Sequence, residues 1–307
     1  MDRDAIGQAR SEAGLARPMG GGVSPAIALC LAATVLLWAS SFAGIGAALE
    51  DFSPGPLTLG RFLVASIVFL GLAAARPPRR PAKRDLGLLL VLGLFGIVVY
   101  HLLIGYGQRT VSAGAAGTLS NTSPIFTALW GTLFLGERLR SLGWVGIGVA
   151  FAGAMLIGIG EGRDFSLELG ALLVLLAALT WSVFFALQRR HVARFGPRDL
   201  IAWTTWVGTA GLLPFFPALL AEAPLAGAEA CLALVYLGVG PTVLAYVAWA
   251  FVLSRLPVSF ASGFLYLVPA LAFLFGWLWL GQVPSWLTAA GGMVALAGVM
   301  LVSLRGR

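Results

Sequence analysis

The sequence predicts an all-α membrane protein in which ten transmembrane helices form two inverted five-helix repeats around a central cavity. Of its 307 residues, 59% are hydrophobic and 11% are charged, and the mean hydropathy is +0.92. So little polar surface cannot cover a water-soluble globule of this length. Ten apolar runs are each close to the roughly 20 residues that cross a bilayer. The second five of these runs repeat the first five.

The repeat is visible when one half of the chain is laid over the other. Five is an odd number of spans, so the second copy enters the membrane from the opposite side, and the halves are inverted. Inverted repeats allow two equivalent conformations and hence alternating access. A duplication kept only for folding is the alternative. The matched positions are Pro124 with Pro269, Gly136 with Gly281, Gly146 with Gly291, Ala150 with Ala295, Gly153 with Gly298, Met155 with Met300 and, after a small gap, Trp38 with Trp181 and Leu57 with Leu200.

The first repeat takes residues 26–160 and follows a polar, Gly-rich segment over 1–25, which we expect to be a flexible cytoplasmic tail. This tail is not expected to be a cleaved signal peptide, because it carries acidic residues and the first apolar run has full span length. The five spans of this repeat are predicted at 26–48, 56–75, 86–108, 112–135 and 141–159.

The second repeat takes residues 161–307 and includes a short cytoplasmic C-terminus. In the last span of each repeat, small residues four positions apart let helices pack closely, within or between protomers. These residues are Gly146, Ala150 and Ala154 in the first copy and Gly291 and Ala295 in the second. The spans are predicted at 168–188, 198–220, 228–253, 257–280 and 285–303.

The placement of charge orients the spans. Most of the 20 Lys and Arg residues fall in one set of loops and ends, and only Arg109 and Arg163 fall in the other set. The positive-inside rule then puts both termini in the cytoplasm of a multi-pass protein of the bacterial inner membrane. Nucleic-acid binding is the rival explanation of the sequence pI near 10.2. It is not expected, because the basic residues lie in short loops between spans.

Several functions are excluded by features that the sequence lacks. It has no Gly-x-x-x-x-Gly-Lys loop for ATP and no His, Cys and carboxylate cluster for a metal, so we expect neither a metal nor a cofactor. Cys30 and Cys231 fall near opposite membrane faces and cannot pair within one chain. The segment from Phe260 to Gly263 lacks the leading Gly of an intramembrane serine-protease motif. An enzyme is therefore not expected.

Three motifs in order resemble the EamA-type drug/metabolite transporters over nearly the whole chain. They are Trp38-Ala39-Ser40-Ser41-Phe42 in span 1, Leu59-Gly60-Arg61-Phe62 in span 2 and Gly136-Glu137-Arg138-Leu139 closing span 4. The placement of aromatic residues is most similar to that of bacterial aromatic amino-acid exporters. The resemblance implies that spans 1, 3, 4, 6, 8 and 9 surround a cavity, which spans 5 and 10 buttress. One departure is Gly281-Gln282, where such repeats often carry Gly-Glu.

Polar residues inside the spans mark candidate cavity walls independently, because polar groups in a membrane tend to face protein or water. The repeat pairs His101 with Tyr246, and Asn121 with Tyr266, at matched depths. Aromatic side chains with a polar tip suit a ligand that has an apolar body and polar ends. Span 4 also places Gly117, Ser120, Asn121 and Pro124 on one helical face, as span 3 does His101, Ile104, Gly105 and Gln108. The predicted substrate-binding residues are Trp38, Tyr100, His101, Asn121, Trp181, Phe185, Gln188, Tyr246, Trp249 and Tyr266.

Each of these residues also has a structural interpretation. Trp38 and Trp181 suit an interfacial belt or simple packing, and His101 and Asn121 suit hydrogen bonds between helices. Glu137 suits a local ion pair with its basic neighbours.

Three residues are candidates for gating or for hinges. Arg61 either extends its guanidinium toward the headgroups, meeting Glu50 or Asp51, or gates the cavity or binds a substrate carboxylate. Pro124 and Pro269 each remove a backbone hydrogen bond and are expected to kink the fourth span of their repeat.

The spans carry no Asp or Glu near their middle, and this limits the class of substrate, because a cationic drug would find no countercharge there. A zwitterionic or neutral metabolite with an apolar portion fits better, with half-helix dipoles, Arg61 and Asn121 available for a carboxylate. The sequence thus predicts a secondary transporter that exports amino acids, aromatic and other apolar ones favoured. Alternatives are a multidrug or other small-metabolite exporter, a passive channel and a non-transporting scaffold.

The expected partners are the amino-acid substrate and the lipid bilayer, with no nucleic acid, and the chain is expected to be a monomer or a weak homo-oligomer. Proton coupling would run through His101 or Glu137. Facilitated diffusion is the alternative.

Overall fold

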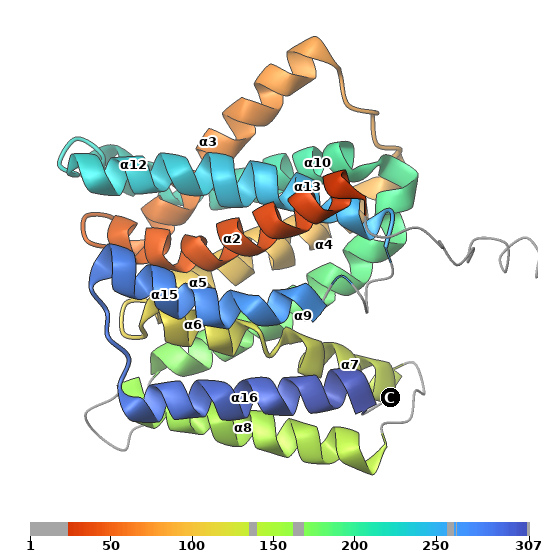
Figure 1. The fold of residues 1–307 in the computed structure, drawn as a ribbon. Helices are drawn as coiled ribbons and strands as arrows, with labels where there is room; N and C mark the ends of the chain where they lie inside the picture. The colour runs from red at the N-terminus through yellow and green to blue at the C-terminus, as the bar shows by residue number, and fades with distance from the viewer. Residues whose placement is uncertain (1–23, 135–139, 162–168, 257–260, 262, 306–307) are drawn as a thin grey trace, which may run out of the picture.

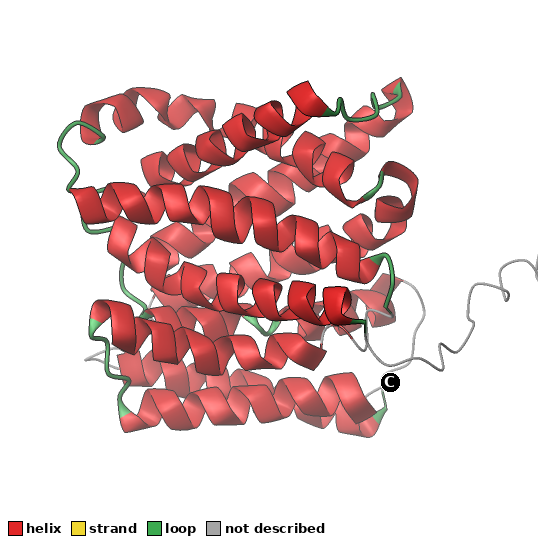
Figure 2. Cartoon of the chain, turned by 45° about the horizontal axis from the view of Figure 1, so that its top comes forward, coloured by secondary structure: helices red, strands yellow, loops and turns green. Residues whose placement is uncertain are grey.

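The computed structural model describes residues 24–134, 140–161, 169–256, 261 and 263–305, and every regular element within these ranges is a helix (Figures 1 and 2). Most of the expected tail, and the segment that holds Glu137, lie outside the described residues. Five helical segments are long and apolar enough to cross a membrane: Pro25–Ala48, Pro54–Ala75, Lys83–Gly107, Pro197–Glu222 and Ala228–Leu253. Four shorter ones are also apolar: Ser141–Ile157, Leu169–Phe185, Phe264–Leu280 and Trp286–Val302. The predicted all-α membrane class is therefore confirmed.

The first two helices begin on serine caps followed by proline. Ser24 accepts a hydrogen bond from the Ile27 amide at 3.4 Å ahead of α2, which spans Pro25–Ala48. Ser53 precedes α3, which spans Pro54–Ala75. Proline suits the first turn because its missing N–H has no helical partner there. Figure 1 shows α3 leaning away from the other helices toward the basic loop that follows it.

Two of the long segments contain a π turn at matched positions. Leu94–Val99 is a π turn (η2) between α4 (Leu86–Gly93) and α5 (Tyr100–Gly107). Gly238–Leu244 is a π turn (η4) between α12 (Ala228–Leu237) and α13 (Ala245–Leu253). The offset that places Pro124 on Pro269 also overlays these two turns. π turns inside α-helices occur frequently at functional sites.

The predicted span 112–135 is interrupted. Helix α6 covers Ala113–Ser120, and α7 starts again at Ser123 and runs to Phe134. Asn121 caps α6, and Pro124, the second residue of α7, has no amide to donate back across the gap. In the second half, a 3-10 turn over Phe264–Leu267 (η5) precedes α15 (Val268–Leu280), whose second residue is Pro269. The expected kink at Pro124 is therefore a full interruption of the span, whereas Pro269 is the second residue of α15 and follows directly on the η5 turn.

The remaining helices complete the bundle, with α9 (Leu169–Phe195) passing well beyond the predicted end at 188. Helices α8 (Ser141–Glu161) and α16 (Trp286–Arg305) run antiparallel along one edge of Figure 1. Their small residues face each other, so this stripe serves packing within one chain. A Cβ on Gly298 would come within 2.6 Å of the Gly146 carbonyl oxygen. The other elements are α10 (Pro197–Leu212), η3 (Leu213–Phe215), α11 (Phe216–Glu222) and a 3-10 turn over Lys83–Asp85.

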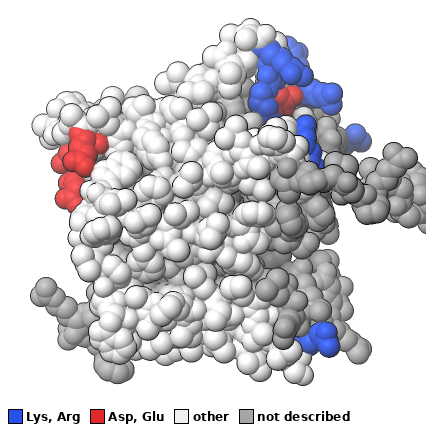
Figure 3. Space-filling view, viewed as in Figure 1, with Lys and Arg blue, Asp and Glu red and all other residues white. Residues whose placement is uncertain are grey.

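Charged residues gather at the two ends of the helices (Figure 3). Between α3 and α4, Arg76, Arg79, Arg80, Lys83 and Arg84 mark the basic end. Glu50, Asp51, Glu222 and Glu229 mark the acidic end, where they follow α2, close α11 and start α12. Large apolar side chains between the ends are exposed, among them Leu29, Ile67, Trp144 and Trp277. This arrangement is typical of helices that face lipid.

Candidate functional site

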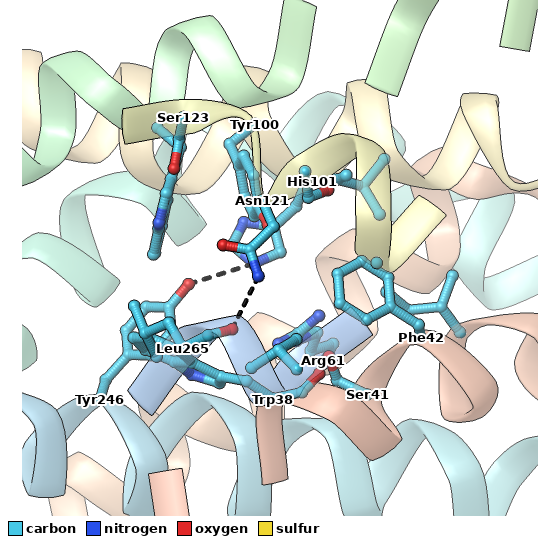
Figure 4. Close-up of a pocket in the computed structure, with 16 residues that line it drawn as sticks. Trp38, Ser41, Phe42, Arg61, Tyr100, His101, Asn121, Ser123, Tyr246 and Leu265 are labelled. Carbon is cyan, nitrogen blue, oxygen red and sulfur yellow. Dashed lines mark hydrogen bonds between the residues drawn. The ribbon is translucent and has the colours of Figure 1, made fainter. Parts of the chain in front are cut away.

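A pocket lies between the two halves of the chain (Figure 4). Its volume open to the centres of water molecules is about 70 Å³. A single water needs about 10–15 Å³ on this measure, so the pocket as it stands holds a few waters. It is lined by Trp38, Ser41, Phe42, Ile45, Arg61, Tyr100, His101, Ile104, Gly117, Ser120, Asn121, Ser123, Trp181, Tyr246, Leu265 and Val268.

One wall of the pocket is aromatic. Trp181 stacks on Tyr100 with ring centroids 4.5 Å apart and approaches Tyr246 at 5.7 Å. Trp38 meets the Trp181 ring edge-on at 6.0 Å and the Tyr246 ring edge-on at 5.7 Å. Edge-on and offset contacts are the geometries that aromatic quadrupoles favour. The repeat mates Trp38 and Trp181 are thus in direct contact at the pocket.

The repeat mates His101 and Tyr246 are also in contact. The Nδ1 atom of His101 lies 3.0 Å from the Ile97 carbonyl oxygen, and its Nε2 lies 3.3 Å from the Tyr246 hydroxyl. A carbonyl oxygen only accepts, so Nδ1 carries the proton and Nε2 accepts from the tyrosine. Both ring nitrogens are therefore engaged within the protein, and His101 holds Tyr246 against the pocket.

Replacing Tyr246 with phenylalanine is expected to destabilise the fold by about 1–3 kcal/mol, because Nε2 of His101 becomes a buried acceptor without a donor. Thermal unfolding of the purified protein in detergent measures the effect. Tyr106→Phe on α5 is the matched control, since the Tyr106 side chain is 45% exposed. Equal stability of the two variants would contradict the hydrogen bond.

Arg61 is buried at the pocket and is only 4% exposed. Its Nε donates to the Thr242 hydroxyl at 2.7 Å, and that hydroxyl donates to the Leu237 carbonyl oxygen at 2.8 Å. Gly238 permits this approach, because a Cβ there would meet the Arg61 carbonyl oxygen at 2.8 Å. The expected extension toward the headgroups is therefore wrong.

No carboxylate neutralises Arg61 in the part of the chain that is described. The one ion pair found there joins Arg198 to Asp199 at 2.8 Å. Asp51, the partner considered from the sequence, instead accepts from the Gly227 amide at 2.8 Å. A buried cation without a counterion is costly in a membrane protein and marks a functional site by default.

The interruption between α6 and α7 meets the η5 turn beside the pocket. Asn121 Nδ2 donates to the Leu265 carbonyl oxygen at 2.7 Å, which joins the end of α6 to the turn before α15. Figure 4 shows this bond among the pocket residues. Ser123 and Val268, the first residues of α7 and α15, both line the pocket. Two half-helices therefore start at its wall.

Several predicted site residues lie outside the pocket lining. Trp249 is 1% exposed and packs on Trp38 at 5.6 Å, and Phe185 packs between Trp181 and Trp249. Gln188 is buried beyond them. Tyr266 packs against the cluster of Ile125, Ile147 and Val299, while Pro124 and Pro269 follow the lining residues Ser123 and Val268. Gln108 donates to the Phe42 carbonyl oxygen at 2.8 Å.

Sequence reasoning also missed lining residues in α2. Ser41, Phe42 and Ile45 follow Trp38 by three, four and seven positions. Helical spacing from Trp38 identifies all three, since such positions share a face. Leu265 had no comparable signal, because it lies in the 3-10 turn.

The chain matches the description "EamA-like transporter family" twice, over residues 25–159 and 168–304. The chain belongs to the EamA family. It is therefore a multi-pass membrane transporter, as its apolar helices indicate. The second match reproduces the internal duplication and puts the pocket of this EamA protein between two copies of the family unit.

Relatives of this EamA protein cover most of its length. It is 40% identical over 270 residues to the uncharacterized transporter YdfC of Bacillus subtilis, with 88% of each chain covered. It is 34% identical over 275 residues to a "Probable terminal-alkyne amino-acid exporter" of Streptantibioticus cattleyicolor, covering 90% of this chain and 92% of that one. The uncharacterized inner membrane transporter YedA of Escherichia coli is 27% identical over 281 residues, with 89% of each chain covered.

A protein of known crystal structure has the same fold. The two superpose with a TM-score of 0.63 at 24% identity, covering 92% of this chain and 97% of the other. The similarity extends over most of this EamA protein.

Proposed function

We propose that this EamA protein exports amino acids, with aromatic and other apolar ones favoured, across the bacterial inner membrane by alternating access. In this proposal ten spans form two inverted repeats, and both termini lie in the cytoplasm. The double family match and the basic loops support it. The acidic end then faces outward. The Streptantibioticus relative, described as a probable terminal-alkyne amino-acid exporter, supports the substrate class.

One observation carries the proposal: a pocket between the repeats combines an aromatic wall with a buried arginine that has no described counterion. Trp38, Trp181 and Tyr246 offer apolar faces for a side chain. Arg61 offers a fixed positive charge for a carboxylate. Because the described pocket lining contains no acidic residue, a cationic drug has no countercharge there.

Counterflow in proteoliposomes tests the proposal. Vesicles loaded with unlabelled phenylalanine are expected to accumulate external labelled phenylalanine transiently, with saturation at high concentration. Linear flux without counterflow would indicate a channel, and no flux of any amino acid would overturn the proposal. Equal rates with and without a pH gradient would indicate facilitated diffusion.

Alternating access is supported by tight contacts on the acidic side of the pocket. Gln282 Oε1, beyond the end of α15, accepts from the Ala113 amide at 2.9 Å. Gly114 lies directly against the Phe273 ring, and a Cβ on Gly117 would come within 2.7 Å of the Ala272 side chain. In the proposed orientation these contacts close the pocket from the outside.

Gly114→Ala is expected to open this closure, because its methyl group occupies the space of the Phe273 ring. The measurement is labelling of Ser120→Cys by a membrane-impermeant maleimide added outside, with Cys30 and Cys231 replaced by serine. Labelling is expected to rise several-fold, as for a shift of about 1 kcal/mol between two states. Gly71→Ala is the matched control, since no atom lies within 4 Å of that added methyl. Unchanged labelling in Gly114→Ala would refute the closure.

A further inference from the structure

We infer that the pocket recognises a single carboxylate joined to an apolar body, and that it tolerates the α-ammonium group of an amino acid without requiring it. This inference rests on the proposed function and names its substrate class. It assigns the carboxylate to Arg61, beside the start of α7.

The guanidinium of Arg61 has one bidentate edge available. Thr242 accepts a hydrogen bond from Arg61 Nε. Within the described ranges this side chain makes no other hydrogen bond or ion pair. The two terminal nitrogens therefore remain to donate, and their parallel N–H bonds match the two oxygens of a carboxylate. Figure 4 shows Arg61 among the pocket residues, on the same side as Ser41 and Phe42.

The start of α7 adds positive potential to the same space. Helix α7 has 12 residues, and its first residue, Ser123, lines the pocket with Arg61. Helix α15 adds no free donor at Val268, because the Val268 amide already donates to the Leu265 carbonyl oxygen in the preceding η5 turn. The N-terminal end of a helix carries a positive partial charge that stabilises anions. Discontinuous membrane helices direct such ends at anionic substrate groups. Arg61 and the start of α7 therefore both favour an anion in this space.

A further donor in the lining lacks a partner. Trp38 Nε1 is buried, and no acceptor bonds to it within the described part of the chain. An unpaired buried N–H costs free energy unless a ligand or water accepts from it. Trp38 can therefore donate to an oxygen of a substrate that lies against the aromatic wall.

The ammonium group finds no equivalent partner. The residues that line the pocket include no Asp or Glu, and His101 has both ring nitrogens engaged. The acceptors that remain are neutral, such as the Tyr246 oxygen and the Asn121 amide oxygen. Hydrogen bonds between a charged and a neutral group are weaker than those in a salt bridge of matched geometry. The carboxylate is thus the group that every substrate must carry.

A series of phenylalanine analogues tests the carboxylate requirement in the counterflow assay. 3-Phenylpropionate keeps the carboxylate and lacks the ammonium, whereas phenylalaninamide keeps the ammonium and lacks the carboxylate. We expect 3-phenylpropionate to inhibit labelled phenylalanine counterflow within about threefold of phenylalanine, and phenylalaninamide to be about tenfold weaker or worse. Inhibition by the amide that equals that by phenylalanine, or none by 3-phenylpropionate, would overturn the inference.

Two substitutions test whether Arg61 is the residue that distinguishes these analogues. In Arg61→Gln the preference for phenylalanine over phenylalaninamide is expected to fall about tenfold, while Arg61→Lys keeps part of it because its charge remains without the bidentate edge. Arg255→Gln is the matched control, since the Arg255 guanidinium lies outside the pocket over the Phe251 ring at 3.5 Å. A preference that Arg61→Gln and Arg61→Lys both leave unchanged would contradict the assignment.

The two proposals fail separately. Counterflow of phenylalanine together with strong competition by phenylalaninamide would refute only the carboxylate requirement. If no amino acid is transported, binding of the same analogues is measured by the thermal stabilisation of the purified protein, which needs no transport. Greater stabilisation by phenylalaninamide than by 3-phenylpropionate would then overturn the inference, and the reverse order would support it without the amino-acid assignment.

Discussion

Replacing Trp181 with alanine is expected to lower amino-acid counterflow by about tenfold or more and to destabilise the protein by about 3–5 kcal/mol. The Trp181 ring contacts five other rings, including stacked contacts with Tyr100 at 4.5 Å and Phe184 at 4.8 Å. Its removal leaves a cavity in the core and takes away one face of the pocket. Counterflow and thermal unfolding measure the two effects.

Two further tryptophan variants separate binding from folding. Trp181→Phe keeps an aromatic face and is expected to retain most of the stability while weakening counterflow. Trp277→Ala is the control for loss of an indole, because Trp277 is 55% exposed on α15. If Trp181→Ala were to transport phenylalanine with an unchanged KM, this ring would have no part in binding.

Gly153→Ala is expected to destabilise the protein by about 1–3 kcal/mol or more, as overpacking does in a rigid core. A Cβ at Gly153 would overlap the Ala295 backbone and come within 2.7 Å of the Gly291 carbonyl oxygen. Backbone atoms cannot rotate aside as a side chain can, so α8 and α16 must separate along their length. Thermal unfolding in detergent measures the loss.

The same helix offers the control. Gly148→Ala adds the same methyl group on α8 where no atom lies within 4 Å. It is expected to leave stability unchanged or slightly raised, because alanine has the higher helix propensity. Equal unfolding temperatures for the two variants would show that α8 and α16 do not pack this closely.

The repeat in the sequence predicted mates at matched depth, and the structure adds that two of the three pairs are in direct contact. His101 touches Tyr246, and Trp38 touches Trp181. Asn121 departs from this pattern, since it bonds to the Leu265 backbone next to its mate Tyr266. That contact depends on the 3-10 turn before α15. Hydropathy does not register such a turn, because it measures side-chain transfer and not backbone hydrogen bonds.

The position of Arg61 could not be derived from its own span. Near the end of an apolar run, an arginine has two low-energy choices, the headgroups or a polar partner within the protein. The partner is Thr242, 181 positions along the chain, and the approach needs a glycine at 238. Thr242 and Gly238 both lie in the second half of the chain. Only the three-dimensional contact between α3 and η4 decides between the choices.

The π turns have a consequence for how the pocket is built. Each turn holds one residue more than an α-helical turn, and one residue corresponds to about 100° of rotation around a helix axis. Tyr100 and His101 begin α5 directly after η2, and Tyr246 follows η4 by two positions. The extra residue in each π turn therefore sets the direction in which these side chains point around the helix axis. Deleting one residue from a π turn would rotate this wall away from Arg61, although the sequence would still contain every lining residue. The pocket therefore depends on the number of residues in each π turn as well as on the identity of the lining residues.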